Sequence, residues 1–131
     1  MKPEELQLGD IVATTPSGMP IKVVAIHRKK VAYHACTDRF SWVRIGLLQP
    51  IPLTPEILEK NGFIGDKNVC KTKVRDDSKD ELWQCEYAWY LKNLRIKNRT
   101  NGSVARLYNI MFVHELQHAL RLCGINKEIE L

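Results

Sequence analysis

Short apolar runs separated by turn residues occupy the first 48 residues of the chain. Between Leu8 and Leu48 the runs "DIVATT", "PIKVVAIH", "VAYHAC" and "FSWVRIGLL" are divided by "PSG", "RKK" and "TDR". Runs of this length, with Pro, Gly and Asp between them, are typical of a β-meander that curls into a small barrel or half-sandwich. His27 and His34 fall within these strands or at their ends, and we interpret them as surface or half-buried side chains rather than metal ligands.

The segment "IPLTPEILEKNGF" predicts a complete short helix. Thr54 is a good N-cap, and Pro55 suits the first helical position. Gly62 can adopt the left-handed conformation that ends a helix. After it, "KNVCKTKVRDDSKD" predicts a strand followed by an exposed acidic turn.

The run "ELWQCEYAWYL" alternates in the manner of a strand with one buried face. We predict that its aromatic stripe, Trp83, Tyr87 and Trp89, is buried against the C-terminal helix. "LRIKNR" continues as a second strand, and Asn101-Gly102 is a strong hairpin signal before the return strand "SVARLYNIM". A closing helix over residues 112–123 is ended by Gly124.

These elements predict an α+β fold. A small β-barrel-like meander forms residues 1–52, and residues 53–131 hold the short capped helix and an antiparallel hairpin sheet packed by one C-terminal helix. The two parts would pack against each other, either as halves of one domain or as two domains.

Three segments, "LGDIV", "PIPLTPEILEKNGF" and "FVHELQHALRLCGI", carry a resemblance to a known group. In these three segments the chain resembles small uncharacterised gut-bacterial and prophage proteins. Their pattern has an N-terminal L-x-x-G-x-x-V, a P-I-P-L-T-x-E-x-L-x-K-x-G-F segment and a C-terminal V-H-x-L-Q helix. The matching positions are Pro50, Ile51, Pro52, Leu53, Thr54, Glu56, Leu58, Lys60, Gly62, Phe63, Val113, His114, Leu116 and Gln117. The resemblance implies a shared fold without an established activity. In that pattern the positions of Glu115 and His118 can carry amide residues, so the resemblance does not support a zinc motif.

The last helix contains His114, Glu115 and His118 in the spacing H-E-x-x-H. In zinc peptidases this spacing puts two imidazole ligands on one helix face, with a glutamate as general base. A third histidine would be expected ten residues after the first, where this chain has Gly124, and Arg121 places a cation on the same face. A helical wheel puts His114, Gln117, His118 and Arg121 on the surface side. We therefore predict a packing helix and keep a zinc-dependent hydrolase as the alternative.

A second candidate is the basic strand of Arg95, Lys97 and Arg99. Alternate cations can follow a phosphate backbone, and the net charge of +5 is compatible with weak polyanion binding. The competing interpretation is an edge strand that charge keeps soluble, which we favour.

Other classes are disfavoured. The start of the chain has no apolar run of signal-peptide length, and no segment approaches the roughly 18 apolar residues of a membrane span, so we expect a cytoplasmic protein without a membrane partner. The four cysteines form no C-x-x-C pair and are expected to be reduced.

We assign no catalytic residue, metal ligand or cofactor. The sequence most favours a non-catalytic binding or adaptor module of a mobile element or prophage, with an unknown protein partner. A weak nucleic-acid-binding protein is the second alternative.

Overall fold

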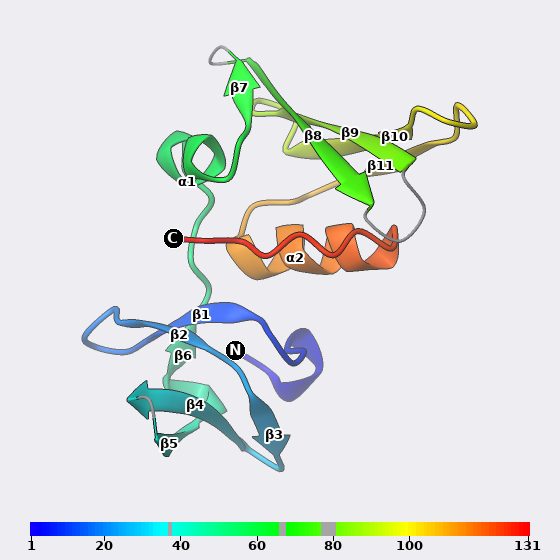
Figure 1. The fold of residues 1–131 in the computed structure, drawn as a ribbon. Coiled ribbons are helices and arrows are strands. Elements are labelled where there is room, and N and C mark those ends of the chain that lie inside the picture. The colour runs from blue at the N-terminus through cyan, green and yellow to red at the C-terminus, as the bar shows by residue number, and fades with distance from the viewer. Residues whose placement is uncertain (37, 66–67, 77–80) are drawn as a thin grey trace. The chain divides into compact units, whose positions relative to one another are not determined.

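The computed structural model describes residues 1–36, 38–65, 68–76 and 81–131. Within them the fold is α+β, with eleven strands in three antiparallel sheets and two α-helices (Figure 1). The predicted fold class is therefore confirmed, although the N-terminal strands form two open sheets and no closed barrel in these residues. Neither α-helix of the described chain has the length and apolar character needed to cross a bilayer.

The chain divides into two compact units. Unit 1 comprises Met1–Pro52 with Phe112–His114, and unit 2 comprises Leu53–Met111 with Glu115–Leu131. The helix α2 (Val113–Leu122) therefore begins in unit 1 and continues in unit 2.

Unit 1 contains two three-stranded sheets and two short 3-10 turns, Pro3–Glu5 and Ile45–Leu47. The first sheet has the order β2-β1-β6, formed by β1 (Ile11–Thr14), β2 (Pro20–Lys22) and β6 (Leu48–Gln49). The second has the order β3-β4-β5, formed by β3 (Ala25–His27), β4 (Lys30–Cys36) and β5 (Arg39–Arg44).

The core of unit 1 is an aliphatic cluster that includes Val12 and Val31, both fully buried. Ile26, Val31 and Val43 lie directly across from one another in β3, β4 and β5, and all three belong to this cluster or pack against it. Because alternate residues of a strand point to opposite faces, this register turns one face of the β3-β4-β5 sheet inward and leaves the other outward.

Unit 2 begins with the helix α1 (Pro55–Lys60), whose ends follow the sequence prediction. The Thr54 hydroxyl accepts a hydrogen bond from the Ile57 amide at 3.2 Å, and Gly62 has a φ of 86° just after the helix. Asn61, buried at the helix end, holds the C-terminal segment. Its side-chain amide donates to the Ile57 and Glu130 carbonyls at 2.7 Å each and accepts from the Glu130 amide at 2.8 Å.

The sheet of unit 2 has five strands in the order β11-β10-β9-β8-β7. These are β7 (Ile64–Gly65), β8 (Val69–Asp76), β9 (Glu81–Ala88), β10 (Asn93–Asn98) and β11 (Val104–Leu107). The predicted hairpin turn at Asn101-Gly102 joins β10 to β11, with a φ of 77° at the glycine. The predicted acidic turn after β8 lies at residues 77–80, outside the described residues.

One face of this sheet is buried, and α2 runs along that side of unit 2 (Figure 1). Cys85, Tyr87, Leu94 and Ile96 are fully buried there. The Tyr87 hydroxyl donates to the Ile110 carbonyl at 2.5 Å. The predicted burial of the aromatic stripe is thus confirmed for Tyr87, whereas the neighbouring tryptophans of the stripe are half-buried.

Candidate functional site

The H-E-x-x-H motif lies in the first two turns of α2, and part of it is not on the surface. His114 and Gln117 are each only 7% exposed, whereas His118 is half-buried. The predicted surface position of His114 and Gln117 is therefore wrong. The helix is therefore buried over more than one stripe, and Ile125 and Ile129 of the segment that follows it are buried as well.

Glu115 has a structural position at the start of α2. Its carboxylate accepts a hydrogen bond from the Met111 amide at 3.1 Å, so the third residue of the helix reaches back to an amide before the first turn. Burial and, to a lesser extent, the Glu115 carboxylate together raise the pKa of the Tyr87 phenol to about 12. The hydrogen bond holds Glu115 against the backbone that precedes α2.

A metal site needs at least three converging ligand side chains. Among the residues that the structure describes, no group of three or more His, Cys, Asp and Glu side chains is placed to hold a metal ion. His114 instead stacks on Phe112, with ring centroids 6.0 Å apart. In α2, Glu115 therefore bonds the backbone at the helix start and His114 contacts an aromatic ring. Among the described residues, no third ligand for zinc lies beside the two histidines.

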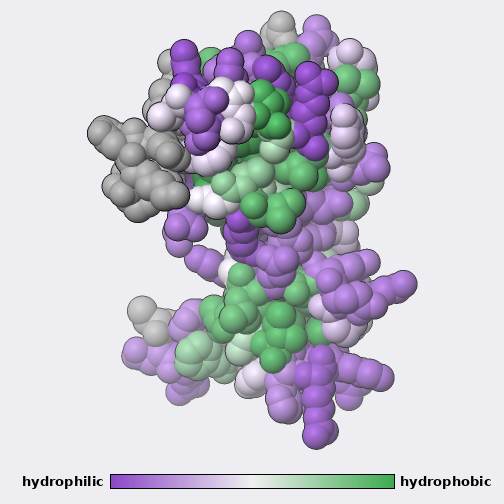
Figure 2. All heavy atoms as spheres, turned by 90° about the vertical axis from the view of Figure 1, so that its right-hand side faces the viewer, coloured by the Kyte–Doolittle hydropathy of each residue, from purple (hydrophilic) through white to green (hydrophobic). Residues whose placement is uncertain are grey.

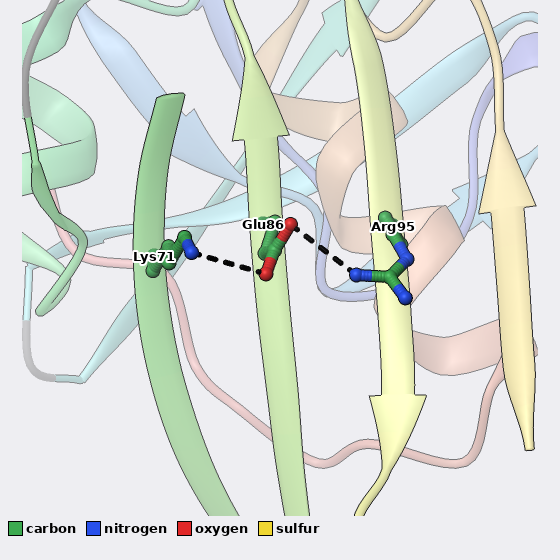
Figure 3. A network of polar contacts seen from close by, with 3 residues as sticks. All are labelled: Lys71, Glu86 and Arg95. Atoms are coloured by element: carbon green, nitrogen blue, oxygen red, sulfur yellow. Dashed lines mark hydrogen bonds and ion pairs between the residues drawn. The ribbon is translucent and has the colours of Figure 1, made fainter. Parts of the chain in front are cut away.

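The predicted basic strand, β10, is an interior strand with β9 and β11 on its two sides, so the edge-strand interpretation is wrong. Its outward side chains belong to the unit 2 outer face, which we define as Lys71, Glu86, Arg95 and Lys97. Figure 3 shows Glu86 between two cations of neighbouring strands. Its carboxylate lies 3.4 Å from Lys71 Nζ and 3.5 Å from Arg95 Nη1.

The three predicted cations of this strand do not form one continuous row. Arg95 and Lys97 point outward from β10, whereas Arg99 lies in the turn that follows it. Glu86, nine positions before Arg95 in sequence, is brought alongside it by the β9-β10 register. An acid from the neighbouring strand therefore neutralises part of the charge that the sequence of β10 presents.

The second sheet of unit 1 carries a different outward surface, which we call the unit 1 outer face. Its cross-strand rows are His27, Lys30 and Arg44; Ala25, Ala32 and Trp42; and His34 and Phe40. Phe40 is 61% exposed and Trp42 52% exposed. His34 lies against Phe40 with ring centroids 4.5 Å apart. On the face drawn in Figure 2, hydrophobic side chains likewise reach the surface in patches that hydrophilic side chains border.

The unit 1 outer face is also rich in cations. Residues 25–44 contain five lysines and arginines against one aspartate, Asp38. All five are exposed, and none forms an ion pair with a described residue. Lys30 and Arg44 stand in the rows of the unit 1 outer face, and Arg28 and Lys29 lie in the turn beside it. Arg39 follows the opposite alternation to Phe40 and Trp42 on β5 and is not part of this face. This charge differs from that of the unit 2 outer face because no carboxylate of the described residues forms an ion pair with these cations.

The sequence contains a signal for this surface, although the signal is an alternation of residue types and matches no known motif. The alternation in "RFSWVR" puts Phe40, Trp42 and Arg44 on one strand face, and "HRKK" spans the turn between β3 and β4. The alternation alone does not say which face is buried. Only the pairing of Val43 with the fully buried Val31 shows that the aromatic side points outward.

Unit 2 also contains a cavity of about 510 Å³. It is lined by Pro55, Glu59, Phe63, Ile64, Gly65, Cys70 and Trp89. The Trp89 indole donates to the Cys70 sulfur at 3.3 Å, and Lys92 Nζ lies 5.3 Å from the centre of the Trp89 ring. The lining is mostly apolar, with one carboxylate and no second polar group placed to orient a ligand among the lining residues.

Comparisons of the chain with protein-family models, with curated proteins and with solved structures gave no match.

Proposed function

We propose that this chain is a non-catalytic binding module that acts through the unit 1 outer face. The observation that supports it is the pair Phe40 and Trp42, two large rings exposed on an ordered β-strand. Exposed aromatic side chains on a rigid element are costly in water and are typical of surfaces that a partner covers. The H-E-x-x-H helix supports catalysis less well, because Glu115 is bonded to the backbone and His114 is buried.

The setting of this function is part of the proposal. The resemblance to prophage proteins favours a role in a mobile element. Cys85 and Cys123 form no disulfide with a described residue, and reduced thiols favour a reducing compartment, for which we propose the cytoplasm.

Weak polyanion binding through Arg95, Lys97 and Arg99 is a second proposal, with less support. Its cations are half-buried or displaced into a turn, and Glu86 pairs with Arg95. We expect this surface to contribute less than the unit 1 outer face to any binding of anions.

A photo-crosslinking experiment tests the main proposal. The photoreactive residue benzoylphenylalanine would replace Trp42, and in a matched control it would replace Tyr108 of unit 2, which is 62% exposed. After irradiation in cells that naturally make the chain, we expect an adduct from position 42 and none from position 108. The same adducts from both positions, or none from position 42, would show that the unit 1 outer face is not a binding surface.

A further inference from the structure

We infer that the partner of the unit 1 outer face is a single-stranded nucleic acid, an inference that rests on the binding function proposed above. Two properties of the surface point to this chemistry, and they are independent of each other. One is an excess of unpaired positive charge, and the other is a set of exposed rings at regular spacing.

The charge suits a phosphate backbone. The formal net charge of the whole chain is +5, and residues 25–44, with five cations and one acid, carry most of that excess. Cations that neutralise phosphates release condensed counterions, which drives binding to nucleic acids at low salt. The turn between β3 and β4 places Arg28, Lys29 and Lys30 at consecutive positions, and all three side chains are exposed. A phosphate group is therefore complementary to this end of the sheet.

The rings suit unpaired bases. Phe40 and Trp42 are two positions apart on β5, so their Cα atoms are about 7 Å apart and their side chains leave the same face of the strand. The partners of Trp42 in its row are Ala25 and Ala32, so no long side chain of this row covers the indole. Stacking of bases on such rings tolerates any sequence, because every base has an aromatic face.

The order of these groups along β5 favours a single strand over a duplex. Arg44, Trp42 and Phe40 follow one another on alternate positions of the same strand, with the basic turn beside Arg44. A strand whose phosphates lie at Arg44 and the turn could stack successive bases on the two rings. In a duplex the bases are already stacked and paired, so the rings would have no free base faces to contact.

Fluorescence anisotropy with a labelled oligodeoxythymidine on the order of ten nucleotides long tests the inference. We expect binding that weakens with salt. The variant Phe40→Ala/Trp42→Ala should lose roughly five-fold in affinity or more per ring, with the salt dependence unchanged. The variant Arg28→Gln/Lys29→Gln/Lys30→Gln should lower the slope of log affinity against log salt by about 0.7 for each lost phosphate contact.

Two matched controls belong to unit 2. Tyr108→Ala removes a ring with the exposure of Phe40, and Arg95→Gln/Lys97→Gln/Arg99→Gln removes the same number of cations as the turn variant. Both should retain most of the affinity. Circular dichroism of every variant checks that it is folded, and Phe40→Leu with Trp42→Leu replaces the aromatic pair if the alanine variant is unfolded.

Inorganic polyphosphate and a DNA duplex are the comparison ligands, because neither offers free bases. Equal affinity for polyphosphate, or a ring variant that binds oligodeoxythymidine as tightly as the native chain, would overturn the inference.

The position 42 crosslink separates this inference from the function on which it rests. A nuclease-sensitive adduct supports both. A nuclease-resistant adduct, with another protein or with a second copy of the chain, retains the binding function and overturns the nucleic acid. The absence of any adduct overturns both.

Discussion

Two sheet faces of this protein carry exposed or half-buried cations. They differ in the side chains that lie beside these cations. On the unit 2 outer face, Glu86 lies between Lys71 and Arg95 at 3.4 and 3.5 Å. On the unit 1 outer face, the cations are accompanied by Phe40 and Trp42, both more than half exposed. A pattern of alternate basic residues therefore predicts a charged surface, but the neighbouring strands decide whether that charge is neutralised within the sheet or available to a ligand.

The largest effect on stability is expected from removing a buried aromatic ring, compared with removing an exposed one. Tyr87→Ala in unit 2 should lower the free energy of unfolding by about 3–5 kcal/mol, because it leaves a cavity in the core and removes the partner of the Ile110 carbonyl. Trp42→Ala in unit 1 should lower it by less than about 1 kcal/mol. Urea titration measures both, and equal losses would show that Trp42 belongs to a packed core.

Alkaline pH should destabilise unit 2. Burial raises the pKa of the Cys85 thiol from 9.0 to about 12, and burial raises that of Tyr87 from 10.0 to about 12. The unfolded chain ionises first, so the contribution of these groups is complete below pH 9 and is lost as the pH rises towards 12. We expect a loss of about 3 kcal/mol by roughly pH 11.

Amide hydrogen exchange across this pH range, corrected for its intrinsic rate, should show the loss in β9. Tyr87→Phe removes one of the two ionising groups and should make the pH dependence shallower. A pH profile that Tyr87→Phe leaves unchanged would contradict the assignment.

Asn61→Ala should lower the free energy of unfolding by about 2 kcal/mol, because it removes two hydrogen bonds that join the end of α1 to Glu130 in the C-terminal segment and one to the Ile57 carbonyl of α1 itself. Thr54→Ala, which removes one capping bond of the same helix, should cost about 1 kcal/mol and serves as the reference. Chemical denaturation measures the two variants. An Asn61 variant no less stable than the Thr54 variant would mean that the C-terminal segment contributes little to unit 2.

Glu86→Gln addresses the comparison of the two faces directly. Because the ion pairs are partly exposed, its cost in stability should stay below about 1 kcal/mol. The freed cations should strengthen the weak binding of oligodeoxythymidine to unit 2 at low salt. The measurement is best made in the Phe40→Ala/Trp42→Ala background, where the unit 1 outer face contributes least. Unchanged binding would remove the unit 2 outer face from consideration.

The smallest effect is expected from metal removal. With no described third ligand near His114 and His118, treatment with EDTA should leave the midpoint of thermal unfolding unchanged. Elemental analysis of protein purified without an affinity tag is the companion measurement. One equivalent of zinc per chain would restore the hydrolase alternative.

Much of the local structure could be predicted because its signals lie within a few residues. Thr54, Pro55 and Gly62 define the ends of α1, and Asn101-Gly102 defines a hairpin, since caps and turns depend on side chains that act on the adjacent backbone. The alternation around Tyr87 likewise identified the buried face of β9. These interactions form between near neighbours, so one sequence is enough to indicate them.

Only the tertiary structure decided which candidate side chains are exposed and available to a ligand. His114 is buried although a one-sided helix would expose it, Arg95 is paired by a glutamate from another strand, and Trp42 points outward although the pattern of β5 allows either face. The local sequence does not specify these outcomes, because each depends on which strand or segment the rest of the chain places beside the residue. The sequence by itself determined the elements and their ends, and packing determined which of their faces remain available to a partner.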